Sequence, residues 1–152
     1  NPEQVTLVPD GPDVITSCAG WDTIKFQSYL KEIISIFKEK GIRTSIFVDP
    51  EIEMIEGSKL CGTDRVELYT EGYAINYSKN KEQSIAPYIE AAKKATELGL
   101  GINAGHDLSL ENLEYFVKEI SNLEEVSIGH ALISDSLYLG LENAIQMYKR
   151  LL

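Results

Sequence analysis

The sequence has few of the features that mark secreted or membrane-spanning proteins. Its two cysteines, Cys18 and Cys61, are too few for a disulfide framework and form no CxxC pair, so we interpret them as reduced thiols of a cytoplasmic protein. No apolar run reaches the roughly 18 residues that a membrane-spanning helix needs. Basic residues are also scarce, because 14 lysines and arginines face 24 aspartates and glutamates and the formal net charge is −10. This balance argues against a general affinity for nucleic acid or for an anionic membrane.

Several motifs of catalysis and cofactor binding are absent as well. No GxGxxG opens a helical pattern, which disfavours a dinucleotide site, and the sequence contains no P-loop and no GxSxG. A metal site could be drawn from His106, Asp107 and His130, but nothing in their spacing requires a metal ion. We therefore expect no metal in this protein.

What the sequence does contain is a regular alternation of strand and helix patterns over 152 residues, a length suited to one domain. Short apolar runs predict strands at 5–9, 43–49, 65–70, 100–104 and 125–128. Apolar residues at helical spacing predict helices at 22–40, 51–60, 82–98, 109–120 and 134–152, and the polar stretch before 82 predicts a long loop. Five strand–helix units indicate an α/β fold with a parallel sheet, either an open doubly wound sheet or part of a barrel.

The polar residues of the predicted strands favour the barrel. Asp49, Glu67, Asn103, His106 and His130 lie on strands or at their C-terminal ends, in four different units. A barrel brings such ends to one mouth, whereas an open sheet spreads them along a line. We therefore predict that residues 1–152 form a single domain, the C-terminal part of a (β/α)8 TIM barrel, and that three further units precede it.

Two strands end in the dipeptide Gly-His and lead into helical patterns, at Gly105-His106 and at Gly129-His130. A helix that starts there offers free N–H groups to an anion, so these ends predict a phosphate site. His106 could serve as a general acid or base, or could be a loop histidine bonded to backbone. The second dipeptide could bind phosphate, or could be a tight turn that needs glycine.

Three other positions carry a functional and a structural interpretation. Glu67 stands between two apolar residues of a strand, so it points either into the barrel or outward on an edge strand, and a buried carboxylate needs a partner. Asp49 precedes Pro50 and is expected to cap the next helix. Thr16 could donate its hydroxyl to a ligand or simply fold its loop.

The basic residues of the sequence fall mainly at strand starts, such as Arg43 and Arg65, or on helices. The mouth should therefore have little positive charge of its own. An anionic substrate would then depend on helix N-termini, on the histidines and on arginines from outside these residues.

Taken together, these segments resemble the pyridoxine 5′-phosphate synthase family. The similarity runs over nearly the whole chain and is most specific where Asn-Ala-Gly-His106 and Ile-Gly-His130-Ala occur in this order. Further matching blocks are Leu7-Val-Pro9, the segment 41–50, Val66-Glu-Leu-Tyr-Thr70 and Tyr73-Ala74.

The resemblance implies a cytoplasmic, homo-oligomeric TIM-barrel enzyme of vitamin B6 synthesis. Such an enzyme condenses 1-deoxy-D-xylulose 5-phosphate with 3-amino-2-oxopropyl phosphate, without metal or organic cofactor, and releases pyridoxine 5′-phosphate, phosphate and water. By matching position, His106 would be the proton donor and Glu67 would stabilise the transition state. Asp107, Gly129 and His130 would bind the aminooxopropyl phosphate, and Thr16 the deoxyxylulose phosphate.

The sequence also departs from the family pattern. Asp107 stands where the family usually has glycine, and Tyr69 and Glu71 replace its usual histidine and glycine. Two alternatives stay open: another phosphate-binding TIM-barrel isomerase or aldolase, although no lysine stands at a strand end for Schiff-base chemistry, or a non-catalytic barrel whose histidines hold loops together.

The family's first three strands, with two of its acid–base residues, have no counterpart among these residues. We therefore expect the 152-residue chain alone not to catalyse the condensation. An assay of the isolated chain with both substrates tests this, and measurable pyridoxine 5′-phosphate would contradict it.

Overall fold

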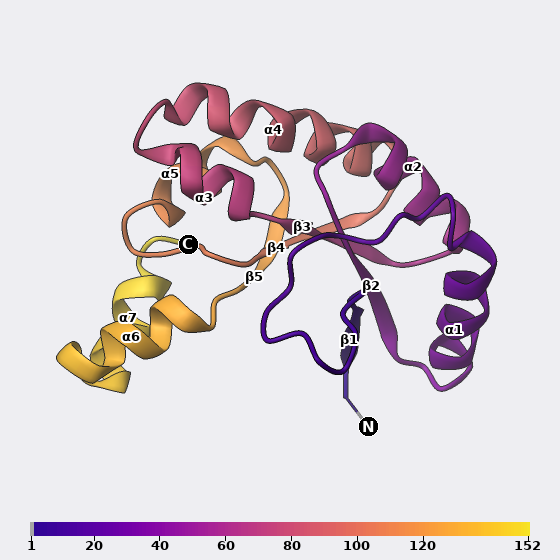
Figure 1. The fold of residues 1–152 in the computed structure, drawn as a ribbon, viewed down its shortest axis with the longest axis horizontal. Helices are drawn as coiled ribbons and strands as arrows, with labels where there is room; N and C mark the ends of the chain where they lie inside the picture. Colours follow the sequence, from indigo (N-terminus) through magenta and orange to yellow (C-terminus); the bar gives the residue numbers. More distant parts are fainter. Residues whose placement is uncertain (1) are drawn as a thin grey trace.

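The computed structural model describes residues 2–152 and contains a parallel sheet of five strands (Figure 1). Each strand pairs with its neighbours in chain order, so no crossover skips a strand. An open doubly wound sheet would reverse its strand order at a switch point. The strands are β1 (Gln4–Leu7), β2 (Arg43–Val48), β3 (Arg65–Tyr69), β4 (Gly101–Gly105) and β5 (Leu123–Ser127).

Seven helices accompany the sheet within residues 2–152, and in this range none is long and apolar enough to cross a membrane. Figure 1 shows α1, α2 and α4 along one side of the sheet, with α6 and α7 together beyond β5. The helices are α1 (Gln27–Glu39), α2 (Ile52–Cys61), α3 (Glu71–Tyr77), α4 (Lys81–Glu97), α5 (Leu113–Glu119), α6 (His130–Leu139) and α7 (Leu141–Lys149).

Two predictions about the helices are wrong. The polar stretch before residue 82 is not a continuous loop, because α3 forms there and buries Tyr73 against the rings of Tyr77, Tyr88 and Phe116. The expected closing helix at 134–152 begins earlier and is divided in two. Gly140 separates α6 from α7, because its φ of +80° and ψ of 142° lie outside the helical region.

The two faces of the sheet differ in chemistry because side chains alternate along each strand. One face is apolar and packs with the helices in the main core. Its central members are Ile46, Val48, Val66, Leu68, Ile102 and Ala104. The opposite face carries polar and aromatic side chains, among them Thr6, Ser45, Phe47, Glu67, Tyr69 and Asn103.

The sheet is strongly curved around this polar face. Gln4 of β1 donates a hydrogen bond of 3.1 Å to Glu125 of β5, although these are the two outer strands. In a flat sheet four strand spacings would hold these strands roughly 19 Å apart. The curvature and the strand order together are consistent with a segment of a TIM barrel.

Six polar side chains bridge the curved sheet below the site and form what we call the polar floor: Gln4, Arg43, Arg65, Asn103, Glu124 and Glu125. Arg65 lies at its centre, 9% exposed, and donates to Asn103 at 2.8 Å. Its guanidinium also pairs with Glu125 at 3.0 Å and with Glu124. Asn103 therefore belongs to this floor, not to the group of residues that line the candidate site.

The loop between β1 and α1 is fixed at its C-terminal end by β2. Asp49 accepts a hydrogen bond of 3.0 Å from the Gly20 N–H, and the Trp21 N–H donates to Phe47 O at 2.8 Å. The prediction that Asp49 caps the next helix is wrong, because Glu51 is the N-cap of α2 and makes no side-chain cap bond. The carboxylate instead holds the loop against the sheet.

This close approach requires glycine at position 20. A Cβ there would lie 2.3 Å from the Asp49 backbone nitrogen, whereas one at Gly11 in the same loop would meet nothing within 4 Å. We expect Gly20→Ala to lower the free energy of unfolding by about 1–3 kcal/mol, the usual range for overpacking. Gly11→Ala is the matched control and should leave it unchanged. Chemical denaturation measures the free energy of unfolding of both variants. Equal values for Gly20→Ala and Gly11→Ala would contradict the close packing at position 20.

Candidate functional site

A cavity of about 580 Å³ lies at the C-terminal edge of the curved sheet. All six residues to which the family resemblance assigns a role line it, although they come from the loop before α1, from β3 and from the segments that follow β4 and β5. Their convergence is a structural finding, whereas their chemical roles stay predictions. The lining residues are Thr6, Val8, Thr16, Ser17, Phe47, Glu67, His106, Asp107, Ser127, Ile128, Gly129 and His130.

Glu67 forms the polar wall of the cavity on the central strand β3. Glu67 is 7% exposed, and the Thr6 hydroxyl donates a hydrogen bond of 3.0 Å to its carboxylate. Burial raises the pKa of Glu67; Thr6 and Ser127 oppose this by hydrogen bonding to the charged form, and the charge of Glu125 adds to it. The result is a carboxyl group with a raised pKa that can take up and release a proton closer to neutral pH.

The glycine at the end of β4 makes room for this carboxylate. A Cβ at Gly105 would lie 2.4 Å from Glu67 Oε1 and 3.1 Å from Ser127 Cβ. Any side chain at position 105 would therefore displace Glu67 from its partners.

His106 is held in an unusual backbone conformation at the same strand end. Its φ is +83° and that of Asp107 is +60°, in the left-handed region that non-glycine residues seldom adopt. The Thr70 hydroxyl donates to Gly105 O at 2.7 Å and also to His106 O, which fixes this turn. The turn directs the imidazole into the cavity.

Both ring nitrogens of His106 face oxygen atoms. Nε2 lies 2.9 Å from the Thr16 hydroxyl, and the donor of that bond depends on the tautomer. Nδ1 is buried and lies 3.1 Å from an Asp107 carboxylate oxygen, but the geometry is not that of a hydrogen bond. This carboxylate can balance the charge of a protonated ring.

The N-terminus of α6 also lines the cavity, through Gly129 and His130. Gly129 is the N-cap and no side chain caps the helix, so its first N–H groups are available to a ligand. Such an end attracts anions. Among the described residues that line the cavity, none is a lysine or an arginine, as the positions of the basic residues predicted.

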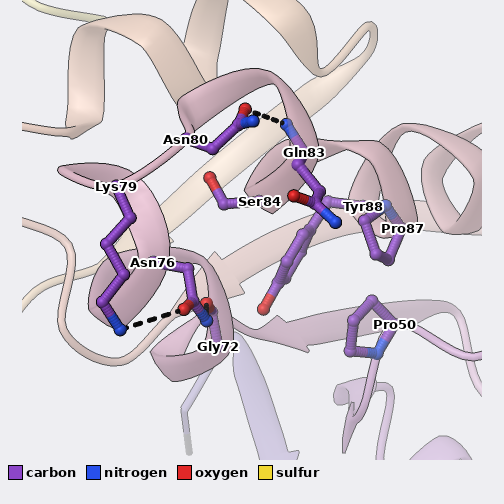
Figure 2. Close-up of a pocket in the computed structure, with 9 residues that line it drawn as sticks. All are labelled: Pro50, Gly72, Asn76, Lys79, Asn80, Gln83, Ser84, Pro87 and Tyr88. Carbon is purple, nitrogen blue, oxygen red and sulfur yellow. Dashed lines mark hydrogen bonds between the residues drawn. The ribbon is translucent and has the colours of Figure 1, made fainter.

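A second cavity of about 440 Å³ lies between α3 and α4, away from these groups (Figure 2). Lys79 is the charged residue among those described that line it, and its amine lies 3.5 Å from Asn76 Oδ1. The Tyr88 hydroxyl at its floor is already bonded, since it donates to Tyr69 O at 3.0 Å and accepts from the Tyr73 N–H at 3.1 Å. This cavity therefore offers amide and lysine groups but no acid–base pair.

Three residues that contact Glu67 or His106 were given no role at the site by the sequence analysis: Thr6, Ser127 and Tyr69. Thr6 and Ser127 each stand between two apolar residues of a strand, as Glu67 does, so the same period of two could have placed them on the polar face. No sequence signal shows that Tyr69 lies against His106, with ring centroids 4.9 Å apart.

The raised pKa of Glu67 predicts a pH-dependent stability. Because the folded pKa lies above the ordinary value of 4.5, the folded state holds this proton more tightly, and stability from this group is lost as pH rises through the folded pKa. We expect Glu67→Gln, which keeps an acceptor for Thr6, to gain stability relative to the parent as pH rises from about 4.5 to neutrality. Unfolding curves across this range measure the difference, and a constant difference would contradict the buried carboxyl.

Known proteins with high sequence identity to this chain share one name. Pyridoxine 5′-phosphate synthases of Flavobacterium johnsoniae and Cytophaga hutchinsonii are both 64% identical to the chain, over 97% and 98% of it. That of Christiangramia forsetii is 61% identical over 99%. The chain spans 62–64% of the length of these relatives.

A solved structure shows the same fold at low identity. The crystal structure of the Amycolatopsis orientalis BexX/CysO complex matches with a TM-score of 0.60 and 14% identity, over 97% of this chain and 53% of the other. The family described as "Pyridoxal phosphate biosynthesis protein PdxJ" matches residues 1–152 throughout. By this match and by the identity to its relatives, the chain belongs to the PdxJ family.

Proposed function

We propose that this chain supplies the catalytic rim of a pyridoxine 5′-phosphate synthase, which condenses 1-deoxy-D-xylulose 5-phosphate with 3-amino-2-oxopropyl phosphate. The observation that carries the proposal is the single cavity in which Glu67, His106 and the N-terminus of α6 meet. It combines a carboxyl group, an imidazole and an anion site, the three functions that this condensation needs. The relatives that bear this enzyme's name support it.

The proposed fold of the active protein is a closed (β/α)8 barrel. Two observations support closure. The sheet is curved enough for the side chains of Gln4 and Glu125 to form a hydrogen bond. Within the described residues, β1 and β5 each have one edge that is not paired with another strand. Further parallel strands between β5 and β1 would satisfy these edges. The cavity would then lie at the C-terminal mouth, where enzymes of this fold hold their substrates.

The phosphate of the aminooxopropyl substrate is proposed to bind at Gly129 and His130. The free N–H groups at the start of α6 can donate to its oxygens, and the helix dipole favours its charge. The Thr16 hydroxyl, which also lines the cavity, is assigned to the deoxyxylulose phosphate. Asp107 is assigned to the aminooxopropyl end through its amine, which a carboxylate attracts.

Proton donation is assigned to His106, and stabilisation of the transition state to Glu67. The condensation expels phosphate and water, and each leaving oxygen must gain a proton. A protonated His106, with Asp107 at 3.1 Å to balance its charge, can donate that proton. The buried Glu67 carboxylate stabilises positive charge that develops on the condensing nitrogen, and its hydrogen bond from Thr6 keeps it in place.

The same proposal includes a cytoplasmic homo-oligomer. Its support is an exposed apolar surface on the last two helices, where Leu137 is 80% and Tyr138 is 91% exposed and Leu141 is 55% exposed. Surfaces of this kind mark contacts between proteins.

Substitution of the two histidines tests the assignment of roles in the full-length protein. We expect His106→Asn to lower kcat by about 10²–10⁴, as for loss of a general acid, with an unchanged Tm because asparagine tolerates the left-handed backbone. His130→Asn should instead raise KM for the aminooxopropyl phosphate. Steady-state kinetics and thermal unfolding measure these effects. An unchanged kcat in His106→Asn would support a non-catalytic histidine.

A further inference from the structure

We propose that Tyr69 is a positioning residue. Its ring holds the His106 ring, and its hydroxyl holds the loop that brings Thr16 to that same His106 ring. We call this loop, residues 10–20, the mouth loop. The consequence for catalysis rests on the proposed function, whereas the contacts themselves do not.

Tyr69 touches both parts of the site from the end of β3. Its ring lies edge-on to His106, with centroids 4.9 Å apart at 85°, and 5.1 Å from the ring of Phe47. Its hydroxyl donates to Ser17 O at 3.2 Å. The residue is 5% exposed, so its ring cannot turn away without leaving a void beside His106.

The position of Tyr69 is itself fixed by its surroundings. Tyr88 of α4 donates to the Tyr69 carbonyl at 3.0 Å, and Figure 2 shows the Tyr88 ring that reaches from α4 into the second cavity. Burial, and next the neighbouring Glu71 carboxylate, raise the pKa of Tyr69. The hydroxyl therefore keeps its proton at neutral pH and can donate it to Ser17 O.

The mouth loop has few other ties to the sheet. Val14 N–H donates to Gly11 O, and the Ser17 hydroxyl donates to Asp10, but both bonds are inside the loop. Among the described residues, the hydrogen bonds that link residues 11–19 to the rest of the chain are Tyr69 to Ser17 and Thr16 to His106.

These two bonds are made by adjacent residues of the loop, so they depend on each other. If Ser17 leaves Tyr69, Thr16 loses the support that holds its hydroxyl 2.9 Å from His106 Nε2. One tyrosine thereby sets both the orientation of the imidazole and the partner of its outer nitrogen. Tyr69 would therefore affect catalysis through His106 and Thr16, without touching the substrate.

NMR on the full chain separates the two contacts of Tyr69. In Tyr69→Phe the ring remains and the hydroxyl is lost. The order parameters of residues 15–19 should then fall from about 0.85 to below about 0.6, and the His106 Nε2 resonance should shift. In Tyr69→Leu the ring is also lost, and the ring-current shift of the His106 side chain should disappear. The protein has two histidines, so His106 can be assigned by comparison with His106→Asn.

A double-mutant cycle with Thr16→Val distinguishes positioning from general stability. If Tyr69 acts through the loop, Tyr69→Phe should shift the His106 Nε2 resonance in the parent but not in the Thr16→Val background. An equal shift in both backgrounds, or unchanged order parameters in Tyr69→Phe, would overturn the proposal.

Tyr148→Phe is the matched control. Tyr148 is also 5% exposed, and its hydroxyl donates to an Asp135 carboxylate oxygen at 2.7 Å, a bond between α7 and α6 that does not involve the mouth loop. It should lower Tm without any change at residues 15–19 or His106. Titration with inorganic phosphate, followed at the Gly129 amide, tests the proposed function separately. Absence of binding there would count against the proposed function and leave the result for Tyr69 standing.

Discussion

The curvature of the sheet is the constraint on which the site depends. Arg65 lies in the middle strand and binds glutamates of β5, while Gln4 reaches Glu125 from the opposite edge of the sheet. Each charge of this polar floor has an opposite charge beside it, which offsets the cost of removing it from water. Because the floor draws the outer strands together, Thr6 and Ser127 come from opposite edges to the same carboxylate, Glu67. In a flat sheet Thr6 and Ser127 would lie too far from that carboxylate to bond it.

The site combines several arrangements that cost stability when taken singly. Glu67 is buried, His106 adopts a left-handed backbone and its Nδ1 has no hydrogen-bond partner among the described residues. The surrounding structure holds the first two in place. The Thr6 hydroxyl donates a hydrogen bond to the carboxylate, and the Thr70 hydroxyl donates to the carbonyl oxygens of Gly105 and His106. Strain of this kind at a cavity wall is typical of functional sites, where groups are kept ready for a ligand.

The strand–helix order and the placement of Glu67 and the two Gly-His dipeptides could be predicted because they follow from local rules, whereas Asp107 was assigned to the site through the family resemblance. Strand patterns have a period of two, and parallel strands deliver their C-terminal ends to one edge. The failures concern long-range contacts. The side chain of Asp49 has the sequence context of a cap, but the distant Gly20 N–H occupies it. The sequence analysis also missed α3, because its buried Tyr73 packs against rings of α4 and α5 that are distant in sequence. Tyr69 is a strand residue in sequence and a support for the mouth loop only in space.

The charges of the cavity restrict how an anionic substrate can lie in it. The chain carries a net charge of −10, and no lysine or arginine is found among the described residues that line the cavity. A phosphate near Asp107 would meet a like charge, whereas one at Gly129 meets the free N–H groups at the start of α6. The helix end is a fixed dipole that needs no counterion, so it can attract an anion inside an acidic protein. An anionic group in this cavity is therefore drawn to the α6 side, away from the carboxylates of Asp107 and Glu67.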